Sequence, residues 1–263
     1  MLLMLFLQWI VAGQQPSLYM KIAIIIQARM GSTRFPGKVL KEVNNEPMLL
    51  FQYKRLQEVK MADLICIATT SNASDNVIFD LCLDNNIPVF RGSENNVLKR
   101  YIDTANHFNA DLIVRSNADC PLIDPFEVDV VIKKMIDRPN VDYVSNILEE
   151  SFPVGMHIEV FSKNALEKAF LEAKEPDEKE HVTPYIYRNS HKFNILSVVN
   201  KINLSHHRWT VDYQEDLVFV QKVVSLLSHT KNRFKMMDVV ELIENTPDLQ
   251  IINHMYQKTQ NLL

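Results

Sequence analysis

Cations and hydroxyls gather in one short stretch of the sequence, residues 28–38, which reads ARMGSTRFPGK. Its candidate anion-binding side chains are Arg29, Ser32, Arg34 and Lys38. A guanidinium group can bind two phosphate oxygens at once, whereas an ammonium group acts as a mobile point charge. We therefore predict that this stretch binds phosphate. The alternative interpretation is a surface loop of solvated charges.

Two common phosphate-binding motifs do not occur in this stretch. Gly31 and Gly37 are too far apart for G-x-x-x-x-G-K-[ST], and Val39 follows Lys38. The motif G-x-G-x-x-G is absent as well. However, an apolar, β-branched run precedes the stretch at residues 22–26. An apolar strand followed by glycine and cations is a common way for α/β proteins to hold a polyphosphate.

Two aspartates are candidate metal ligands because each follows a short apolar run. Asp119 lies in NADCPLID, after the predicted strand 111–115, and Asp212 lies in RWTVDYQED, at the end of a predicted short strand. Carboxylate oxygens are hard ligands that suit Mg²⁺. The competing role for each is a turn or a helix N-cap. That role fits Asp124 better, and Asp216 is interpreted as compensating a helix dipole.

Strand and helix patterns alternate throughout residues 21–145. This alternation predicts an α/β fold with a doubly wound, mostly parallel sheet. Ligands of such sheets bind at the carboxyl ends of the strands, where both the 28–38 stretch and Asp119 fall. The alternation breaks over about 146–205, which predicts an added α+β lobe that acts as a lid or a subunit contact.

The predicted lobe and the segment after it carry further polar candidates. They are His157 and Glu159 near a predicted strand at 154–161, Glu180 and His181 on a predicted helix at 177–189, and Arg208. From the pattern alone, His181 is as easily a core or surface histidine as a substrate contact. No Ser/His/Asp or Cys/His spacing indicates a covalent nucleophile.

Composition excludes several classes of protein. The chain has 263 residues and a net charge of −4, so no global basic field favours nucleic acid as a partner. Its three cysteines lack C-x-x-C spacing, which argues against a structural zinc site or a disulfide framework. A reducing cytoplasm is the simplest setting.

The first 19 residues are apolar for about a dozen positions, too short to span a bilayer comfortably. A signal peptide would require a positively charged start, but no Lys or Arg precedes Lys21. Met20 stands directly before the first predicted strand. We expect 1–19 to be a non-native or flexible extension, no membrane partner, a domain over 20–246 and a tail at 247–263. A weak signal peptide cleaved near Gly13 is the alternative.

The sequence IQARMGSTRFPGK at 26–38 resembles the sugar-acid cytidylyltransferases, including the 3-deoxy-manno-octulosonate (Kdo) enzymes. The closer match is the spore-coat polysaccharide biosynthesis protein F type. The similarity continues in the same order through RGSENNVLKRY (91–101), ADCPLIDP (118–125), FPVGMHIEVFS (152–162), EHVTPYI (180–186) and RWTVDYQEDL (208–217).

The resemblance implies a nucleotide-diphospho-sugar transferase fold and an activity that transfers CMP from CTP to a sugar acid with release of pyrophosphate. It implies Mg²⁺ held by Asp119 and Asp212, and catalytic roles for these two aspartates with Arg29 and Lys38. The implied nucleotide ligands are Ala28, Arg29, Gly31, Ser32, Arg34, Lys38, Gly92 and Ser93. The implied acceptor ligands are His157, Glu159, Glu180, His181 and Arg208. Relatives also suggest a homodimer formed through the lobe, and a role in cell-surface polysaccharide synthesis.

Two positions depart from the family pattern: an aspartate is usual where His157 stands, and an arginine where Lys179 stands. Both lie in the lobe expected to bind the acceptor, so the resemblance says least about the identity of the acceptor.

Two other functions compete. One is a glycosyltransferase of similar fold that uses a nucleotide-sugar, although Asp119-Cys120-Pro121 lacks the second aspartate of a D-x-D pair. The other is a non-catalytic nucleotide-binding protein of polysaccharide assembly. Retention of both candidate metal aspartates and all three loop cations argues against it.

Overall fold

The computed structural model describes residues 20–228 and 233–256. The predicted extension 1–19 and residues 257–263 of the predicted tail lie outside the described residues. Within the two described ranges, no helix combines the length and apolar character that crossing a membrane requires.

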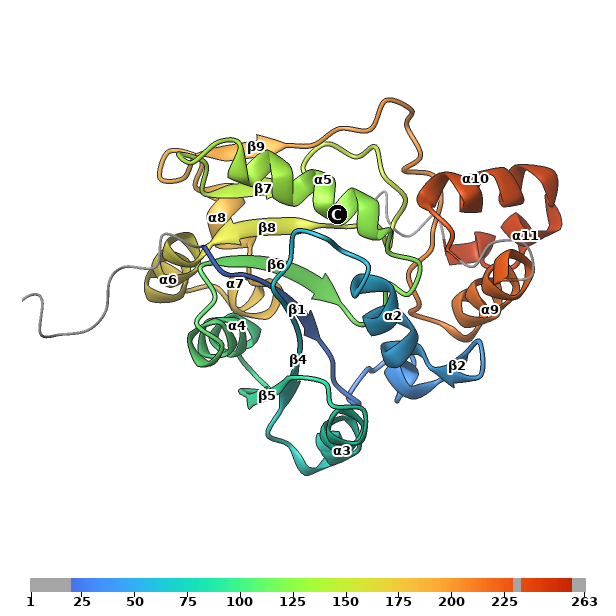
Figure 1. Cartoon of the computed structure of the whole chain (residues 1–263), viewed down its shortest axis with the longest axis horizontal. Coiled ribbons are helices and arrows are strands. Elements are labelled where there is room, and N and C mark those ends of the chain that lie inside the picture. The colour runs from blue at the N-terminus through green and yellow to red at the C-terminus, as the bar shows by residue number, and fades with distance from the viewer. Residues whose placement is uncertain (1–19, 229–232, 257–263) are drawn as a thin grey trace, which may run out of the picture.

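A seven-stranded sheet organises the described part of the chain, in the order β5-β4-β1-β6-β8-β7-β9 (Figure 1). Its strands are β1 (Ile22–Gln27), β4 (Leu64–Thr70), β5 (Val89–Gly92), β6 (Leu112–Asn117), β7 (Tyr143–Ser145), β8 (Glu159–Ser162) and β9 (Ile195–Ser197). A small hairpin is formed by β2 (Glu42–Val43) and β3 (Glu46–Pro47). β1 lies between β4 and β6 and pairs with both in parallel.

The prediction of a mostly parallel α/β sheet is confirmed. β5, β4, β1 and β6 are mutually parallel neighbours, and β7 and β9 pair in parallel. β8 is antiparallel to both β6 and β7. Among the described strands of this sheet, β8 therefore runs against the others, and it comes from the region predicted as an added lobe. Strands β8 and β9 thus make that region continuous with the main sheet.

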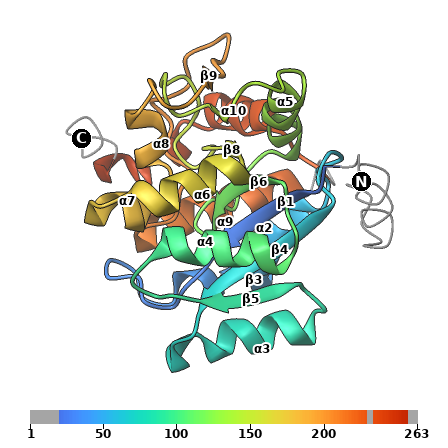
Figure 2. The same cartoon turned by 90° about the vertical axis from the view of Figure 1, so that its left-hand side faces the viewer.

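Helices cover both faces of the sheet (Figure 2). They are α2 (Met48–Leu56), α3 (Asn76–Asp84), α4 (Val97–His107), α5 (Pro125–Ile136), α6 (Lys163–Glu172), α7 (Pro176–His181), α8 (Pro184–Arg188), α9 (Gln214–Ser228), α10 (Met236–Asn245) and α11 (Asp248–Ile251), with 3₁₀ turns η1 (Lys38–Leu40) and η2 (Ala73–Asp75). Alternate residues of β1 enter two separate cores. Ile24 packs on the side of α2, α5 and α9, and Ile25 on the side of α4 and α6. Burial on both faces explains why this strand is almost entirely apolar.

The helix predicted over 177–189 is two helices, so that prediction is wrong in its extent. α7 ends at His181, and Val182 has a φ of +73°. Pro184 then occupies the first turn of α8. Proline has no N–H to continue the hydrogen bonding of a preceding helix, but it is well tolerated at the start of a new one.

The short strand predicted within RWTVD, ending at Asp212, does not form. This segment instead makes an isolated parallel bridge between Val154 and Arg208. The N–H of Val154 donates to the carbonyl of His207 at 2.9 Å, and that of Trp209 donates to the carbonyl of Val154 at 2.7 Å. The segment is therefore held extended beside residues 152–156 rather than within the sheet.

Candidate active site

The stretch 28–38, predicted to bind phosphate, folds back on the carbonyl of Met30. That oxygen accepts from the N–H groups of Ser32 at 2.9 Å and Gly37 at 3.1 Å. Gly37 has a φ of +68°, a conformation that glycine adopts without steric cost. The N–H of Met30 donates to the buried carboxylate of Asp75 at 2.7 Å. Asp75, the last residue of the 3₁₀ turn η2, thus fixes the base of the loop.

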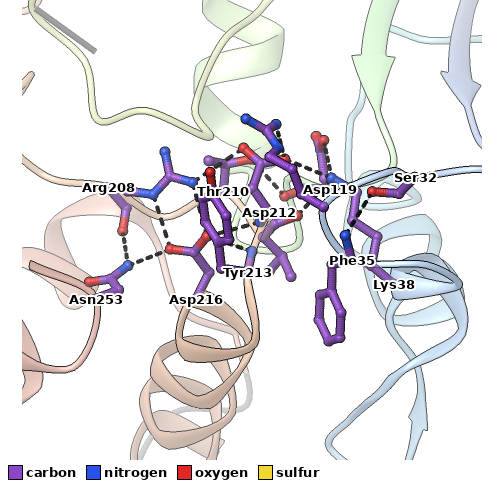
Figure 3. A network of polar contacts seen from close by, with 12 residues as sticks. Ser32, Phe35, Lys38, Asp119, Arg208, Thr210, Asp212, Tyr213, Asp216 and Asn253 are labelled. Atoms are coloured by element: carbon purple, nitrogen blue, oxygen red, sulfur yellow. Dashed lines mark hydrogen bonds and ion pairs between the residues drawn. The ribbon is translucent and has the colours of Figure 1, made fainter. Parts of the chain in front are cut away.

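Lys38 is buried and bridges two carboxylates that are distant in sequence (Figure 3). Its Nζ lies 2.8 Å from Asp119 Oδ2 and 2.9 Å from Asp212 Oδ1, and it donates to the carbonyl of Val211 at 2.8 Å. Burial alone would lower the pKa of Lys38, but the two carboxylates outweigh it and the net shift is upward. Lys38 is therefore charged at neutral pH.

Backbone contacts bring Asp119 and Asp212 together. The carbonyl of Asp119, just past the end of β6, accepts from the N–H of Val211 at 2.8 Å and from the hydroxyl of Thr210 at 3.2 Å. Gly155 allows the neighbouring segment to approach closely, since a Cβ there would lie 2.6 Å from the backbone nitrogen of Thr210. The two aspartates, distant in sequence, thus lie on the same ammonium group of Lys38.

Asp212 collects cations on both carboxylate oxygens. Arg34 Nη2 lies 2.7 Å from Oδ1, the oxygen that Lys38 also contacts, and Arg208 Nη2 lies 3.2 Å from Oδ2. Burial would raise the pKa of Asp212, but Lys38, then Arg34 and Arg208, outweigh it and lower the pKa. Asp212 is therefore ionised at neutral pH.

The pair Asp119 and Asp212 fits a Mg²⁺ site of a particular kind. Both carboxylates already converge on one cationic atom, the Nζ of Lys38. Among the residues that the structure describes, no group of three or more His, Cys, Asp or Glu side chains could form a metal cage. Mg²⁺ is commonly held by one or two carboxylates together with substrate phosphates and waters. The donor set thus suits a metal that arrives with a polyphosphate.

Arg29 connects the loop to the predicted lobe. Its Nη2 lies 3.3 Å from Oε1 of Glu180 on α7, and both side chains are more than a third exposed. His181, the next residue, is exposed at the end of α7. The structure thus brings Glu180 to the 28–38 loop, across 151 residues of sequence.

Gly92 and Ser93 lie at the end of β5, where their neighbour Arg100 holds them. A Cβ on Gly92 would lie 3.0 Å from Arg100 Cγ, and Arg100 Nη1 donates to the carbonyl of Ser93 at 2.6 Å. Burial lowers the pKa of this guanidinium. Sequence reasoning missed Arg100; the signal available was a basic residue within the apolar pattern of α4.

Glu159 belongs to a buried network and does not face an acceptor surface. Its carboxylate contacts Arg115 and accepts from the hydroxyls of Tyr143 and Thr183. Burial would raise the pKa of Glu159, but Arg115 and these hydroxyls outweigh it and lower the pKa. The structure therefore assigns Glu159 to the core, in contrast to the predicted role of acceptor ligand.

Arg208 is also buried, and it holds Asp212 rather than presenting a cation to an acceptor. Its Nε and Nη2 bind the two carboxylate oxygens of Asp216 at 3.0 and 2.9 Å. Asp216 in turn accepts from the N–H groups of Asp212 at 2.9 Å and Tyr213 at 3.0 Å. Asp216 therefore does more than compensate the dipole of α9. The predicted N-cap role of Asp124 is confirmed, because it accepts from the N–H of Phe126 at 2.9 Å.

His157 remains on the accessible side of the molecule. Its side chain is exposed, although surrounding protein desolvates the ring and lowers its pKa. Lys179 is partly exposed on α7, next to Glu180. Both positions where the chain departs from the family pattern are thus accessible to solvent.

The geometry defines a class of protein. A loop of cations and a converging pair of aspartates lie past the carboxyl ends of β1 and β6, at the edge of an α/β sheet where ligands bind. Such an arrangement is chemically suited to bind a polyphosphate together with a divalent cation.

Comparison with known proteins identifies the family. The family model described as "Cytidylyltransferase" matches residues 23–258. The chain therefore belongs to the cytidylyltransferase family, a family of CTP-using nucleotidyltransferases, and resembles the spore-coat polysaccharide biosynthesis type.

Relatives cover nearly the whole chain. An uncharacterised protein of Methanocaldococcus jannaschii is 35% identical over 89% of this chain and 95% of its own. The spore coat polysaccharide biosynthesis protein SpsF of Bacillus subtilis is 29% identical over 86% of this chain and 95% of its own. A solved cytidylyltransferase structure from Leptospira borgpetersenii has 34% identity and a TM-score of 0.84, covering 88% of this chain and 97% of that one.

Proposed function

We propose that the protein is a Mg²⁺-dependent cytidylyltransferase that transfers CMP from CTP to a sugar acid. A hydroxyl oxygen of the acid bonds to the α-phosphorus of CTP, the bond from that phosphorus to the bridging oxygen breaks, and pyrophosphate leaves. The hydroxyl proton passes to solvent. The observation that carries the proposal is the convergence of Asp119 and Asp212 on Lys38, beside Arg34.

The loop cations supply the charge that a triphosphate requires. Each is paired with a carboxylate: Arg29 with Glu180, Arg34 with Asp212, and Lys38 with both aspartates. Binding of a triphosphate exchanges these carboxylates for phosphate oxygens. Mg²⁺, when bound, would neutralise the charge that develops on the phosphate oxygens. Phosphoryl-group chemistry of this kind depends on positioning and charge neutralisation, which fits a site without a covalent nucleophile.

The acceptor belongs on the side formed by the region 146–205. Glu180 lies beside the loop cation Arg29, and His181 and His157 are exposed. We assign acceptor binding to these three residues, and the relationship to SpsF supports a sugar of a cell-surface polysaccharide. A homodimer formed through this region and a cytoplasmic location belong to the same proposal.

The test is pyrophosphate release by the purified protein. Each nucleoside triphosphate is supplied with Mg²⁺ and a panel of sugar acids that includes 2-keto-3-deoxy acids. We expect release with CTP and a subset of the acids, and none after chelation of the metal. Absence of release with CTP and every acid would contradict the proposal. Turnover of a nucleotide-sugar in a parallel assay would instead indicate the glycosyltransferase alternative.

A further inference from the structure

The segment after α10 lies against the candidate active site, although residues 247–263 are predicted as a tail. Residues 248–251 form α11, which packs beside α9 (Figure 1). Leu249 and Asn253 are buried, with 3% and 1% of their surfaces exposed. This burial shows that residues up to 253 are part of the folded domain.

Asn253 contacts two groups that hold Asp212 in place (Figure 3). Its Nδ2 donates to the carbonyl of Arg208 at 3.1 Å and to Asp216 Oδ1 at 2.9 Å. Both partners are acceptors, so the amide nitrogen, and not the amide oxygen, must face them. The side chain therefore stabilises the position of a buried carboxylate and of the backbone next to it.

Asp216 passes this constraint to the aspartate that faces the loop. Its side chain is fully buried, and it accepts hydrogen bonds from Nε and Nη2 of Arg208 and from the N–H of Asp212. Arg208 then donates to Asp212 Oδ2, which leaves Oδ1 toward Lys38 and Arg34. Rotation of the Asp212 carboxylate would require this chain of hydrogen bonds to break.

Tyr256 makes a second connection from the same segment. Its ring stacks on Tyr213 with centroids 3.9 Å apart and an interplanar angle of 7°, and its hydroxyl donates to Glu215 Oε2 at 3.0 Å. The guanidinium of Arg34 lies 5.5 Å from the centroid of Tyr213. The stacked pair therefore supports the ring against which the exposed loop cation rests.

We infer that residues 248–256 are a positioning element of the active site, in which Asn253 orients the Asp212 carboxylate and Tyr256 supports Arg34 through Tyr213. This inference rests on the proposed function, because it treats Asp212 as a ligand of the metal–nucleotide complex. Neither Asn253 nor Tyr256 touches the reacting atoms in this role. Partners that orient a metal ligand typically contribute about 10–100-fold to metal affinity or activity.

The test measures Mn²⁺ binding to the full-length protein in the presence of CTP and without a sugar acid, by electron paramagnetic resonance or calorimetry. Asn253→Ala is expected to weaken Mn²⁺ binding by up to about 10-fold, the lower end of the range for direct partners of a metal ligand, because Asn253 acts on Asp212 through Asp216 and Arg208. The matched control is Leu249→Ala, which removes buried packing from the same segment but none of these hydrogen bonds. Thermal unfolding of both variants records how far each is destabilised.

The result that would overturn the inference is an equal change in Mn²⁺ binding for the two variants, since this would make Asn253 merely structural. A second pair isolates the stack: Tyr256→Phe should keep CTP affinity near that of the wild type, and Tyr256→Ala should lower it several-fold. Equal CTP affinity in this pair would remove Tyr256 from the positioning element.

Failure of the proposed function has a different outcome. If the wild-type protein released no pyrophosphate yet bound Mn²⁺ with CTP, and Asn253→Ala weakened that binding, the positioning role would stand without the proposed reaction. If the wild type turned over CTP and Asn253→Ala changed Mn²⁺ binding no more than Leu249→Ala did, the proposed reaction would stand and the positioning role of Asn253 would fall. Absence of Mn²⁺ binding by the wild type would overturn both.

Discussion

Two clusters of carboxylates and cations lie at the same sheet, and they differ in how open they are. In the first, Asp119 is 25% exposed and Arg34, the partner of Asp212, is 54% exposed, while Lys38 and Asp212 lie beneath them at 10% and 12%. At Glu159, the side chain is 3% exposed and its partner Arg115 is 12% exposed. The first cluster is arranged around a loop, whereas the second lies between β6 and β8.

This difference in exposure distinguishes a cluster suited to ligand binding from one that stabilises the fold. The charges of the open cluster can exchange a protein partner for a phosphate or a metal, because solvent and ligand reach them. The closed cluster has no such freedom, since Glu159 already accepts from Tyr143 and Thr183 besides contacting Arg115. We therefore expect substitutions in the open cluster to change activity, and those in the closed cluster to change the free energy of unfolding.

Glu159→Gln is expected to have the largest effect, a loss of about 3–5 kcal/mol in the free energy of unfolding, because it leaves the Arg115 charge buried and unpaired. Urea unfolding followed by circular dichroism measures it. Glu167→Gln, on the exposed face of α6, is the matched control and should be nearly neutral. Unchanged stability with lost acceptor affinity would return Glu159 to the acceptor site.

Asp119→Asn should lower kcat by about 10²–10³-fold, the range for removing a group that stabilises transition-state charge. Its free energy of unfolding should change less than that of Glu159→Gln, because Lys38 keeps Asp212 as a partner. Steady-state pyrophosphate release gives the rate, with Asp137→Asn, which is exposed, as the control. Near-normal turnover would make Asp119 a turn residue.

His207, which is buried beside Trp209, should make stability depend on pH. Burial, with a contribution from His206, lowers its pKa to about 4. The unfolded chain therefore binds more protons than the folded protein between about pH 4 and the ordinary histidine pKa near 6.5. Stability is fully present above that range and is lost as the pH falls, by up to about 3 kcal/mol.

The measurement for His207 is the unfolding temperature from pH 7 to pH 4, with His207→Phe as the comparison. The variant should show a shallower decline, because its ring does not titrate. Asp212 and Glu159 have lowered pKa values, so their contributions are lost only at more acidic pH. If the unfolding temperatures of the wild type and of His207→Phe fell in parallel with pH, the decline would belong to other groups.

Arg34→Ala should have the smallest effect, a loss of about 1.5–3 kcal/mol in CTP binding, the value of a hydrogen bond to a charged group. Calorimetric titration of CTP with Mg²⁺ measures it. Arg138→Ala removes an exposed arginine beyond the end of α5 and should leave CTP affinity unchanged. An unaltered affinity for Arg34→Ala would count against the phosphate-binding role of the loop.

Local sequence pattern predicted the parts of the site that depend on neighbouring residues. The apolar run of β1 followed by glycine and cations predicted both a buried strand and an anion loop, because each property depends on residues adjacent in the chain. Asp124 before Pro125 predicted a helix N-cap for the same reason. By contrast, RWTVD reads like a strand yet pairs with residues 152–156, since pairing depends on which distant segment supplies the partner.

The sequence by itself determined the α/β alternation, the cationic loop and the identity of the family, since these depend on periodicity and short motifs. Tertiary structure alone decided which carboxylate is free to act. Asp212 and Glu159 are both buried, but Asp212 binds Lys38 and the exposed loop cation Arg34, whereas Glu159 is enclosed by Arg115 and two hydroxyls. Desolvation and hydrogen-bond partners are properties of the folded chain, so no local pattern could assign Arg208, Asp216 and Asn253 to holding Asp212.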